Sequence, residues 1–151
     1  MQGVLRQFAA RRTVTAGLTL VLAAAGVAGT TMAANASSAN GKHSAEVVKV
    51  KTHRPFGKIL YTTHNQALYY LPKGAGSCRG SCLSVWPTLL MPTGKTEPEG
   101  AKCLGTVAFG KRRQVTFNHR RLYTFVSDSR GSVTGNNVEG FKVAKVTAHC
   151  H

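Results

Sequence analysis

Two similar segments, 54 residues apart, limit the fold of this chain more than any other feature. Leu68-Tyr69 in the first segment aligns with Leu122-Tyr123 in the second. A short apolar run and a turn precede each segment, so each is predicted to be the second strand of a β-hairpin. Two hairpins that each have one apolar face can bury those faces against each other. We therefore expect one small domain built from two related hairpin repeats, over about residues 56–87 and 106–146.

The rest of the chain after residue 36 also has the patterns of strands and turns. Val48, Val50 and Thr52 alternate with lysines, which predicts a half-buried strand. Further strands are expected over residues 106–109 and 141–146, and a Pro- and Gly-rich crossing separates the two hairpins. No part of this region has a convincing helical period. The expected class is an all-β, mostly antiparallel domain.

The amino terminus has the composition of an export signal. Three arginines lie in the first 12 residues, and an uncharged apolar run follows over residues 14–29. This run is shorter than the ~20 apolar residues that a membrane-spanning helix needs. Ala34-Asn35-Ala36 has the small-residue form of a signal-peptidase site. We predict a cleaved signal peptide over residues 1–36. A weak membrane anchor is the alternative, and general or twin-arginine export both stay open.

Cleavage after Ala36 would leave 115 of the 151 residues, enough for one domain with a modest core. We expect a flexible lead-in over residues 37–44 and the β domain over residues 45–151. The protein is expected to be secreted or held in the cell envelope, with no transmembrane segment after cleavage. Its oligomeric state is left open.

The charge of the chain is strongly basic. Removing the three arginines of the signal lowers the net charge of +15 by three, to +12. Such a surface attracts polyanions, and outside a cell these include anionic wall polymers and lipid surfaces. A role of the charge in solubility is the alternative. The candidate contacts are the tight basic clusters beside the second hairpin: Lys111, Arg112, Arg113, Arg120 and Arg121. The aromatic motif of RNA-binding domains is missing, so sequence-specific nucleic-acid recognition is not expected.

Four cysteines in an exported domain predict two disulfides, for which three pairings exist. We favour Cys78–Cys82 together with Cys103–Cys150. The first pair closes a tight loop, which Gly80 permits because glycine tolerates positive φ. The other pairings stay open, since connectivity does not follow from sequence alone.

The sequence offers little for catalysis. Hydrolytic sites need paired carboxylates or a nucleophile with a base, and neither arrangement is evident among the five acidic residues and the serines. We expect no catalytic residues and no cofactor. The alternative is a metal-binding or redox module, because thiolate and imidazole suit zinc or copper. Its candidate ligands are His149, Cys150, His151 and His119.

The aromatic residues of the two segments are expected to pack in the core, since large apolar side chains are usually buried. Tyr123 and Phe125 lie two residues apart and project to one face of a strand. Asp128 follows this strand, where a carboxylate can accept backbone N–H bonds and fix a turn. We expect that structural role for Asp128 rather than a catalytic one.

These motifs together resemble the bacterial "secreted repeat of unknown function" family of exported, lipoprotein-like proteins. The family carries a Tyr-x-(Phe/Trp/Tyr)-x-x-Asp motif, which Tyr123, Phe125 and Asp128 match. Leu68-Tyr69, the Cys-x-Gly-x-Cys segment from Cys78 to Cys82, and Trp86-Pro87 resemble its other motifs. The similarity covers about residues 45–146. It implies a small exported β-rich domain and no established reaction.

The chain departs from the family pattern at several positions. In the first copy Leu71 stands where the aromatic residue belongs, and Gly74 stands where the aspartate belongs. Phe141 replaces the usual tryptophan near the end. Cys103 and Cys150 look like additions to the family pattern, which supports their pairing with each other. If the two copies of the motif formed a paired functional site, this chain would have lost the half that the first copy supplies.

Overall fold

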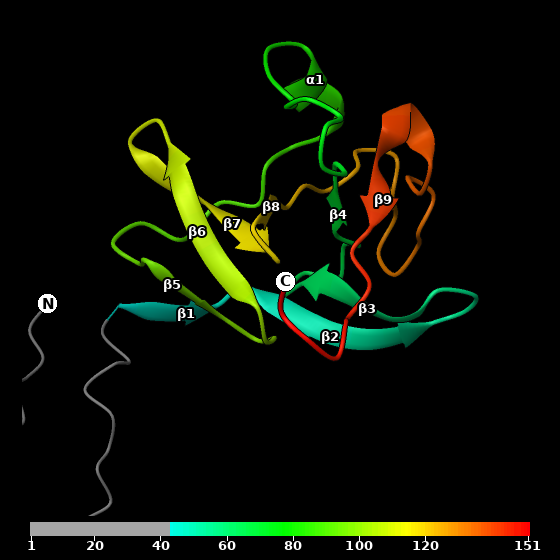
Figure 1. The fold of residues 1–151 in the computed structure, drawn as a ribbon, viewed down its shortest axis with the longest axis horizontal. Coiled ribbons are helices and arrows are strands. Elements are labelled where there is room, and N and C mark those ends of the chain that lie inside the picture. The colour runs from blue at the N-terminus through cyan, green and yellow to red at the C-terminus, as the bar shows by residue number, and fades with distance from the viewer. Residues whose placement is uncertain (1–42) are drawn as a thin grey trace, which may run out of the picture. The chain divides into compact units, whose positions relative to one another are not determined.

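The computed structural model describes residues 43–151, so the predicted signal peptide and residues 37–42 of the lead-in lie outside the described residues. This region contains nine short strands and almost no helix (Figure 1), which confirms the all-β class. The strands are β1 (Ser44–Glu46), β2 (Val48–His53), β3 (Gly57–Thr62), β4 (Tyr69–Tyr70), β5 (Glu97–Glu99), β6 (Leu104–Phe109), β7 (Arg112–Phe117), β8 (Arg120–Arg121) and β9 (Lys142–Val143). One helical turn, α1 (Cys82–Val85), and a 3-10 turn (Val138–Gly140) complete the described elements.

Two long antiparallel hairpins form the frame of the domain. β2 pairs with β3 and β6 pairs with β7 (Figure 1), in registers that place Val48 opposite Thr62 and Leu104 opposite Phe117. The second strand of each hairpin also pairs with the segment that follows it in the chain, as the sequence predicted. Tyr61 bridges Ala67 after β3, and β8 pairs with β7. Both predicted hairpins are therefore present.

The two halves join at the aligned tyrosines. Tyr69 donates its backbone N–H to the carbonyl of Tyr123, and Tyr123 donates to the carbonyl of Tyr69, both at 2.9 Å. The aligned leucines, Leu68 and Leu122, each accept a backbone hydrogen bond from a further segment of the chain. Ala144 donates to the carbonyl of Leu68 at 2.8 Å, and Leu89 donates to that of Leu122 at 3.0 Å. Similar bonds at aligned positions are what two repeats would produce, and the repeat relation itself stays a prediction.

The core has an aromatic part and an aliphatic part. Trp86 is fully buried, and its ring stacks on Phe141 at 3.8 Å and on Phe125 at 4.5 Å between centroids. Tyr69 and Tyr123 complete the aromatic part. The aliphatic part consists of apolar side chains from both hairpins and the crossing, including Val48, Leu60, Leu68, Met91, Val115 and Leu122.

Three details differ from the sequence predictions. Val48 is buried but Val50 is 40% exposed, because only the first residue of β2 lies against the core. The last strand was expected over residues 141–146, but β9 covers only Lys142–Val143, and beyond it Ala144 is buried and Val146 is exposed. The turn α1 is helical but too short to produce a helical period.

The lead-in prediction also ends too late. Ser44 belongs to β1, which pairs in parallel with β5 through Ser44 and Glu97. The preceding His43 accepts backbone N–H bonds from Thr96 and Glu97. The ordered domain therefore includes the last residue of the predicted lead-in, because β5 supplies a pairing edge that the sequence does not reveal.

Both disulfides have the favoured pairing. Cys78 is bonded to Cys82 and Cys103 to Cys150, each with 5.3 Å between Cα atoms. Gly80 has the positive φ of +56° that the short loop was expected to need. Closed disulfides indicate an oxidising compartment. Within residues 43–151, no helix has the length and apolar character to cross a membrane.

Candidate anion-binding groove

The residues of the family motif lie inside the domain. Tyr69 donates its hydroxyl to Asp128 Oδ2 at 2.6 Å, and the Oδ1 atom of Asp128 accepts the backbone N–H and the hydroxyl of Thr134 at 2.8 and 2.7 Å. Asp128 is only 8% exposed. Its carboxylate thus fixes the turn that follows the strand and also ties the turn to Tyr69, which is the structural role expected for it.

Burial and this carboxylate act on the neighbouring phenols. Burial, with the hydrogen bond to Asp128, raises the pKa of Tyr69 above its ordinary value. Burial, with the negative charge of Asp128, also raises the pKa of Tyr61. Both phenols are therefore held in the protonated form, in which Tyr69 can donate.

Trp86 and Pro87 are likewise held by structural contacts. The indole N–H of Trp86 donates to Glu139 Oε2 at 2.7 Å. The carbonyl of Pro87 accepts the backbone N–H of Thr124 at 2.9 Å. The polar groups of the motif are thus engaged within the fold rather than aimed at a ligand.

The five predicted basic contacts do not form one patch. Arg112 and Arg113 lie at the first end of β7, and β8 places Arg120 and Arg121 at its last end. The five residue steps along β7 separate the two ends by roughly 17 Å. Lys111 lies in the exposed turn before β7.

Four of these side chains have contacts within the protein. Arg112 donates to the carbonyl of Met91 at 2.7 Å, and Arg113 donates to Thr106 Oγ1 at 2.7 Å. Arg121 donates to Gln114 Oε1 at 2.8 Å. Arg120 lies over the ring of Tyr70, 5.5 Å from its centroid. Arg113 is therefore tied to its own hairpin and Arg112 to the crossing segment, while Arg120 faces a groove.

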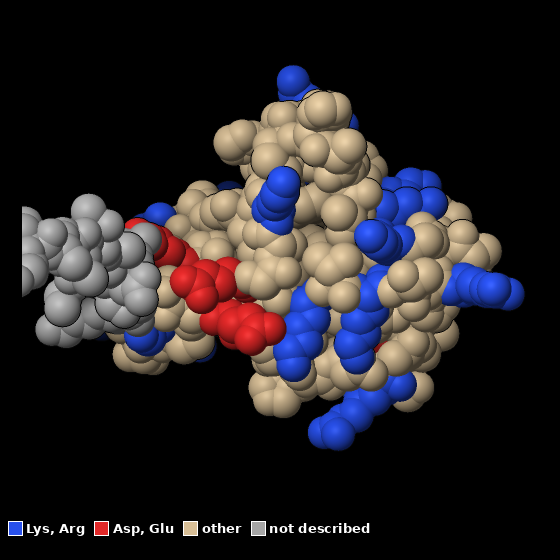
Figure 2. All heavy atoms as spheres, turned by 90° about the horizontal axis from the view of Figure 1, so that it is seen from below, with Lys and Arg blue, Asp and Glu red and all other residues tan. Residues whose placement is uncertain are grey.

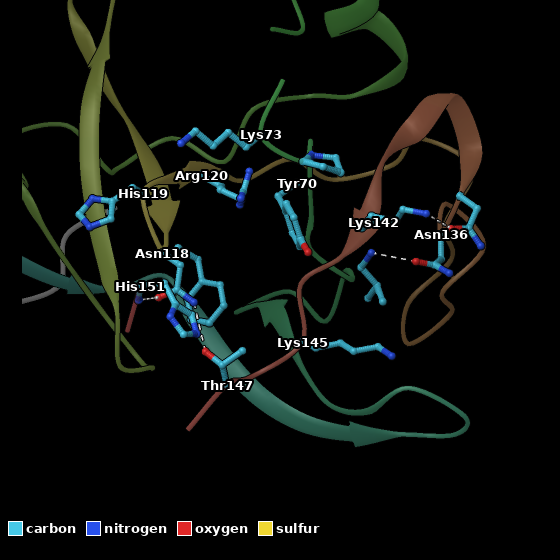
Figure 3. Close-up of a pocket in the computed structure, with 14 residues that line it drawn as sticks. Tyr70, Lys73, Asn118, His119, Arg120, Asn136, Lys142, Lys145, Thr147 and His151 are labelled. Atoms are coloured by element: carbon cyan, nitrogen blue, oxygen red, sulfur yellow. Dashed lines mark hydrogen bonds between the residues drawn. The ribbon is translucent and has the colours of Figure 1, made fainter. Parts of the chain in front are cut away.

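This groove lies among the described residues and has a volume of about 1280 Å³ (Figure 3). Its walls come from the segment after β4, the β7–β8 turn, and the chain around β9. The basic residues that line it are Lys73, Arg120, Lys142 and Lys145, together with His119 and His151. No acidic residue lines it, so the groove presents positive charge and N–H donors.

The β7–β8 turn sets one wall of the groove. Asn118 and His119 both have positive φ, +47° and +62°, as the central residues of a two-residue hairpin turn require. Asn118 Nδ2 donates to Thr147 Oγ1 at 3.1 Å, and its Oδ1 accepts the backbone N–H of His151 at 3.2 Å (Figure 3). Asn118 thereby ties the carboxyl-terminal segment to the turn.

The opposite wall is held by asparagines. Asn136 Oδ1 accepts the backbone N–H of Val143 at 3.0 Å. Lys142 donates to Asn137 Oδ1 (Figure 3). The neutral amide orients the Lys142 ammonium without neutralising it, so its charge stays available.

The acidic residues lie elsewhere in the domain. Glu46, Glu97 and Glu99 belong to the paired strands β1 and β5. In Figure 2 the acidic side chains gather in one patch, while Lys and Arg cover other parts of the same face. Asp128 and Glu139 accept the hydrogen bonds of Tyr69 and Trp86. Within residues 43–151, no carboxylate is paired with the lysines and the arginine that line the groove.

The alternative metal ligands are only partly brought together. His119 and His151 both line the groove, but Cys150 is bonded to Cys103 and offers no thiolate. The carbonyl of His149 accepts the hydroxyl of Thr147 at 2.8 Å. Among the residues that the structure describes, no group of three or more His, Cys, Asp or Glu side chains is placed to hold a metal ion.

Three residues of the groove were not predicted from the sequence. Lys73, Lys142 and Lys145 come from segments about 70 residues apart, and only the pairing of β4 with β9 unites them. The available signal was that Lys142 and Lys145 are the polar residues of the predicted last strand. Its pairing partner was not predicted.

The chain was compared with family models, curated proteins and solved structures, and none of them matches it. Membership of the secreted-repeat family therefore stays a prediction from the motifs.

Proposed function

We propose that this protein is a non-catalytic, exported module that binds an anionic linear polymer of the cell envelope in its basic groove. The observation that carries the proposal is a groove lined by four lysine and arginine residues from three segments, without a carboxylate among the described lining residues. Uncompensated positive charge in a concave site concentrates anions, because the low-dielectric walls focus the field.

The shape of the site favours a polymer chain over a lipid surface. A groove of about 1280 Å³ can surround a strand of phosphate or carboxylate groups on several sides. A flat bilayer would meet only the rim of such a concave surface. The Tyr70 ring also lines the groove, and Arg120 lies over it, which holds the guanidinium at the groove wall.

The export part of the proposal rests on two observations. The first 36 residues have the pattern of a cleaved signal peptide, and both disulfides are closed, as in an oxidising compartment. The lack of a catalytic role is supported by Asp128 and Glu139, whose carboxylates are engaged with Tyr69 and Trp86.

The test is polyphosphate binding by the protein over a range of salt concentrations. If four cations neutralise phosphates, the logarithm of the binding constant should fall with the logarithm of salt at a slope of about 3. Lys142→Glu with Lys145→Glu should abolish binding. The matched control is Lys49→Glu with Lys111→Glu, which makes the same charge change at exposed positions outside the groove and should retain most of the affinity.

Two outcomes would contradict the proposal. Equal loss in both double variants would mean that net charge, not the groove, determines binding. Stronger binding to vesicles with anionic headgroups than to polyphosphate, at equal phosphate concentration, would replace the polymer with a membrane surface.

A further inference from the structure

The aligned tyrosines make equivalent backbone contacts but have unequal hydroxyl contacts. Each exchanges N–H···O bonds with the other at 2.9 Å. The hydroxyl of Tyr69 has the carboxylate of Asp128, which lies five residues after Tyr123. The residue five positions after Tyr69 is Gly74, which has no side chain. The partner that this arrangement would supply to Tyr123 is therefore missing.

The hydroxyl of Tyr123 has no hydrogen-bond partner among residues 43–151. The residue is only 2% exposed, and its ring packs edge-on against Phe141 with 5.3 Å between centroids. Among the described side chains, the one polar atom sealed from solvent without a partner is His53 Nδ1. The Tyr123 hydroxyl therefore keeps an opening to solvent, and it is a donor and acceptor on a buried residue without a partner among the residues that the structure describes.

Tyr123 lines a small pocket of about 210 Å³, together with Gly74, Gly76, Arg120 and Arg121. The pocket also shares Lys73 and His119 with the large groove. No acidic residue lines it. A Cβ atom at Gly74 or Gly76 would meet nothing within 4 Å, so the space beside these glycines is open.

The donors of this pocket match one ligand chemistry. Arg121 uses Nη1 on Gln114, and the guanidinium fork has further N–H donors. Hydrogen bonds from arginine or tyrosine to an oxyanion are charge-assisted and roughly twice as strong as neutral ones. The small volume suits a single carboxylate or phosphate group rather than a length of polymer.

We propose that this pocket is an oxyanion subsite. Tyr123, Arg120 and Arg121 bind a carboxylate or phosphate group of the ligand, which takes the place of an acidic side chain at position 74. This inference rests on the proposed function, because the subsite opens beside the groove. The groove holds the polymer chain, and the subsite anchors one of its charged groups.

The test uses inorganic phosphate and acetate, titrated into the folded protein and followed by NMR of the arginine side chains. In Tyr123→Phe the affinity for the preferred anion should fall about tenfold, the loss expected for one hydrogen bond to a charged group. Preference for phosphate or for acetate identifies which group the subsite accepts.

Position 74 provides a second, independent variant. Gly74→Asp supplies the missing carboxylate from the chain itself and should abolish anion binding. Gly74→Asn is the matched control, because it carries the same backbone strain at φ +86° without the charge, and it should retain binding. Unchanged anion affinity in both Gly74→Asp and Tyr123→Phe would overturn the subsite.

The subsite and the groove can fail separately. Polyphosphate binding without binding of phosphate or acetate would sustain the groove and overturn the subsite. Binding of the small anions that Gly74→Asp abolishes, without polyphosphate binding, would sustain the subsite and overturn the proposed polymer function.

Discussion

The hydroxyl of Tyr69 donates a 2.6 Å hydrogen bond to Asp128, a residue 59 positions later in the chain. The same hydroxyl accepts the backbone N–H of Gly135 at 3.2 Å. These contacts connect the first hairpin to the turn after the second one, inside the core. Tyr69 and Asp128 thereby lock the two halves of the domain together.

Removing this hydroxyl should weaken the fold. Tyr69→Phe leaves the Oδ2 atom of the buried Asp128 carboxylate without its O–H donor, at a cost of about 1–3 kcal/mol in the free energy of unfolding. Tyr123→Phe is the matched control, because its hydroxyl bonds to none of the described residues, and it should cost less than about 0.5 kcal/mol. Chemical denaturation measures both values. Equal losses would show that the Tyr69–Asp128 bond contributes nothing specific.

The same contact predicts a sensitivity to alkali. Burial and the bond to Asp128 raise the pKa of Tyr69 above its ordinary value of 10.0, so folding favours the protonated phenol. This stabilisation is complete below pH 10 and is lost as the pH rises further, because the unfolded chain ionises first. Above that pH, the advantage of the native protein over Tyr69→Phe should shrink by up to ~1.4 kcal/mol per pH unit. An advantage that stays constant from pH 8 to pH 11 would contradict the assignment.

Gly135 should be intolerant of a methyl group. A Cβ atom there would lie 2.8 Å from Trp86 and 3.0 Å from Phe125, so the stacked rings would have to move. Gly135→Ala should cost about 1–3 kcal/mol in stability, as overpacking does. It should also shift the emission of Trp86, the single tryptophan of the chain. Gly105→Ala is the control, because its Cβ would meet only a threonine hydroxyl, at 3.1 Å.

The local parts of the fold could be predicted from the sequence. The hairpins around residues 59–71 and 114–125 follow from apolar runs that flank turn residues. The structure confirms the predicted pairing of Cys103 with Cys150. Once Cys78 is assigned to Cys82 in the tight loop, Cys103 and Cys150 are the two cysteines that remain. The turn role of Asp128 also followed from its place after a strand.

The non-local parts could not be predicted. Nothing near Tyr69 in the sequence indicates Asp128 as its partner, because the contact depends on how the two hairpins pack. The groove unites Lys73, Arg120 and Lys142 through strand pairings between distant segments. Clusters such as Arg112-Arg113 are conspicuous in the sequence, yet their side chains donate to Met91 and Thr106. The clusters of basic residues in the sequence therefore did not predict which basic side chains line the groove.

Export with cleavage after Ala36 predicts a protein of defined mass. We expect a mature chain that begins at Ser37, with all four cysteines oxidised and therefore four hydrogens lighter than the reduced chain. Intact-mass spectrometry with and without reductant and a thiol-blocking reagent measures this. Blocked free thiols or bound metal would favour the metal or redox alternative and direct attention to His119, His151 and the cysteines.

The two disulfides should differ in their contribution to stability. Cys78–Cys82 closes a loop over a separation of 4 residues and Cys103–Cys150 over 47. On the loop-entropy model the short bridge stabilises by ~2 kcal/mol and the long one by ~4 kcal/mol, because a longer loop removes more entropy from the unfolded chain. Replacing each pair with serines and measuring unfolding in guanidinium chloride tests the order.

The long bridge also holds the carboxyl-terminal segment, whose His151 lines the groove. Its removal should therefore weaken polyphosphate binding as well, whereas removal of the short bridge should leave that binding intact. If removal of the short bridge instead had the larger effect on stability and on polyphosphate binding, the carboxyl-terminal segment would be held in place by its other contacts, such as those of Asn118.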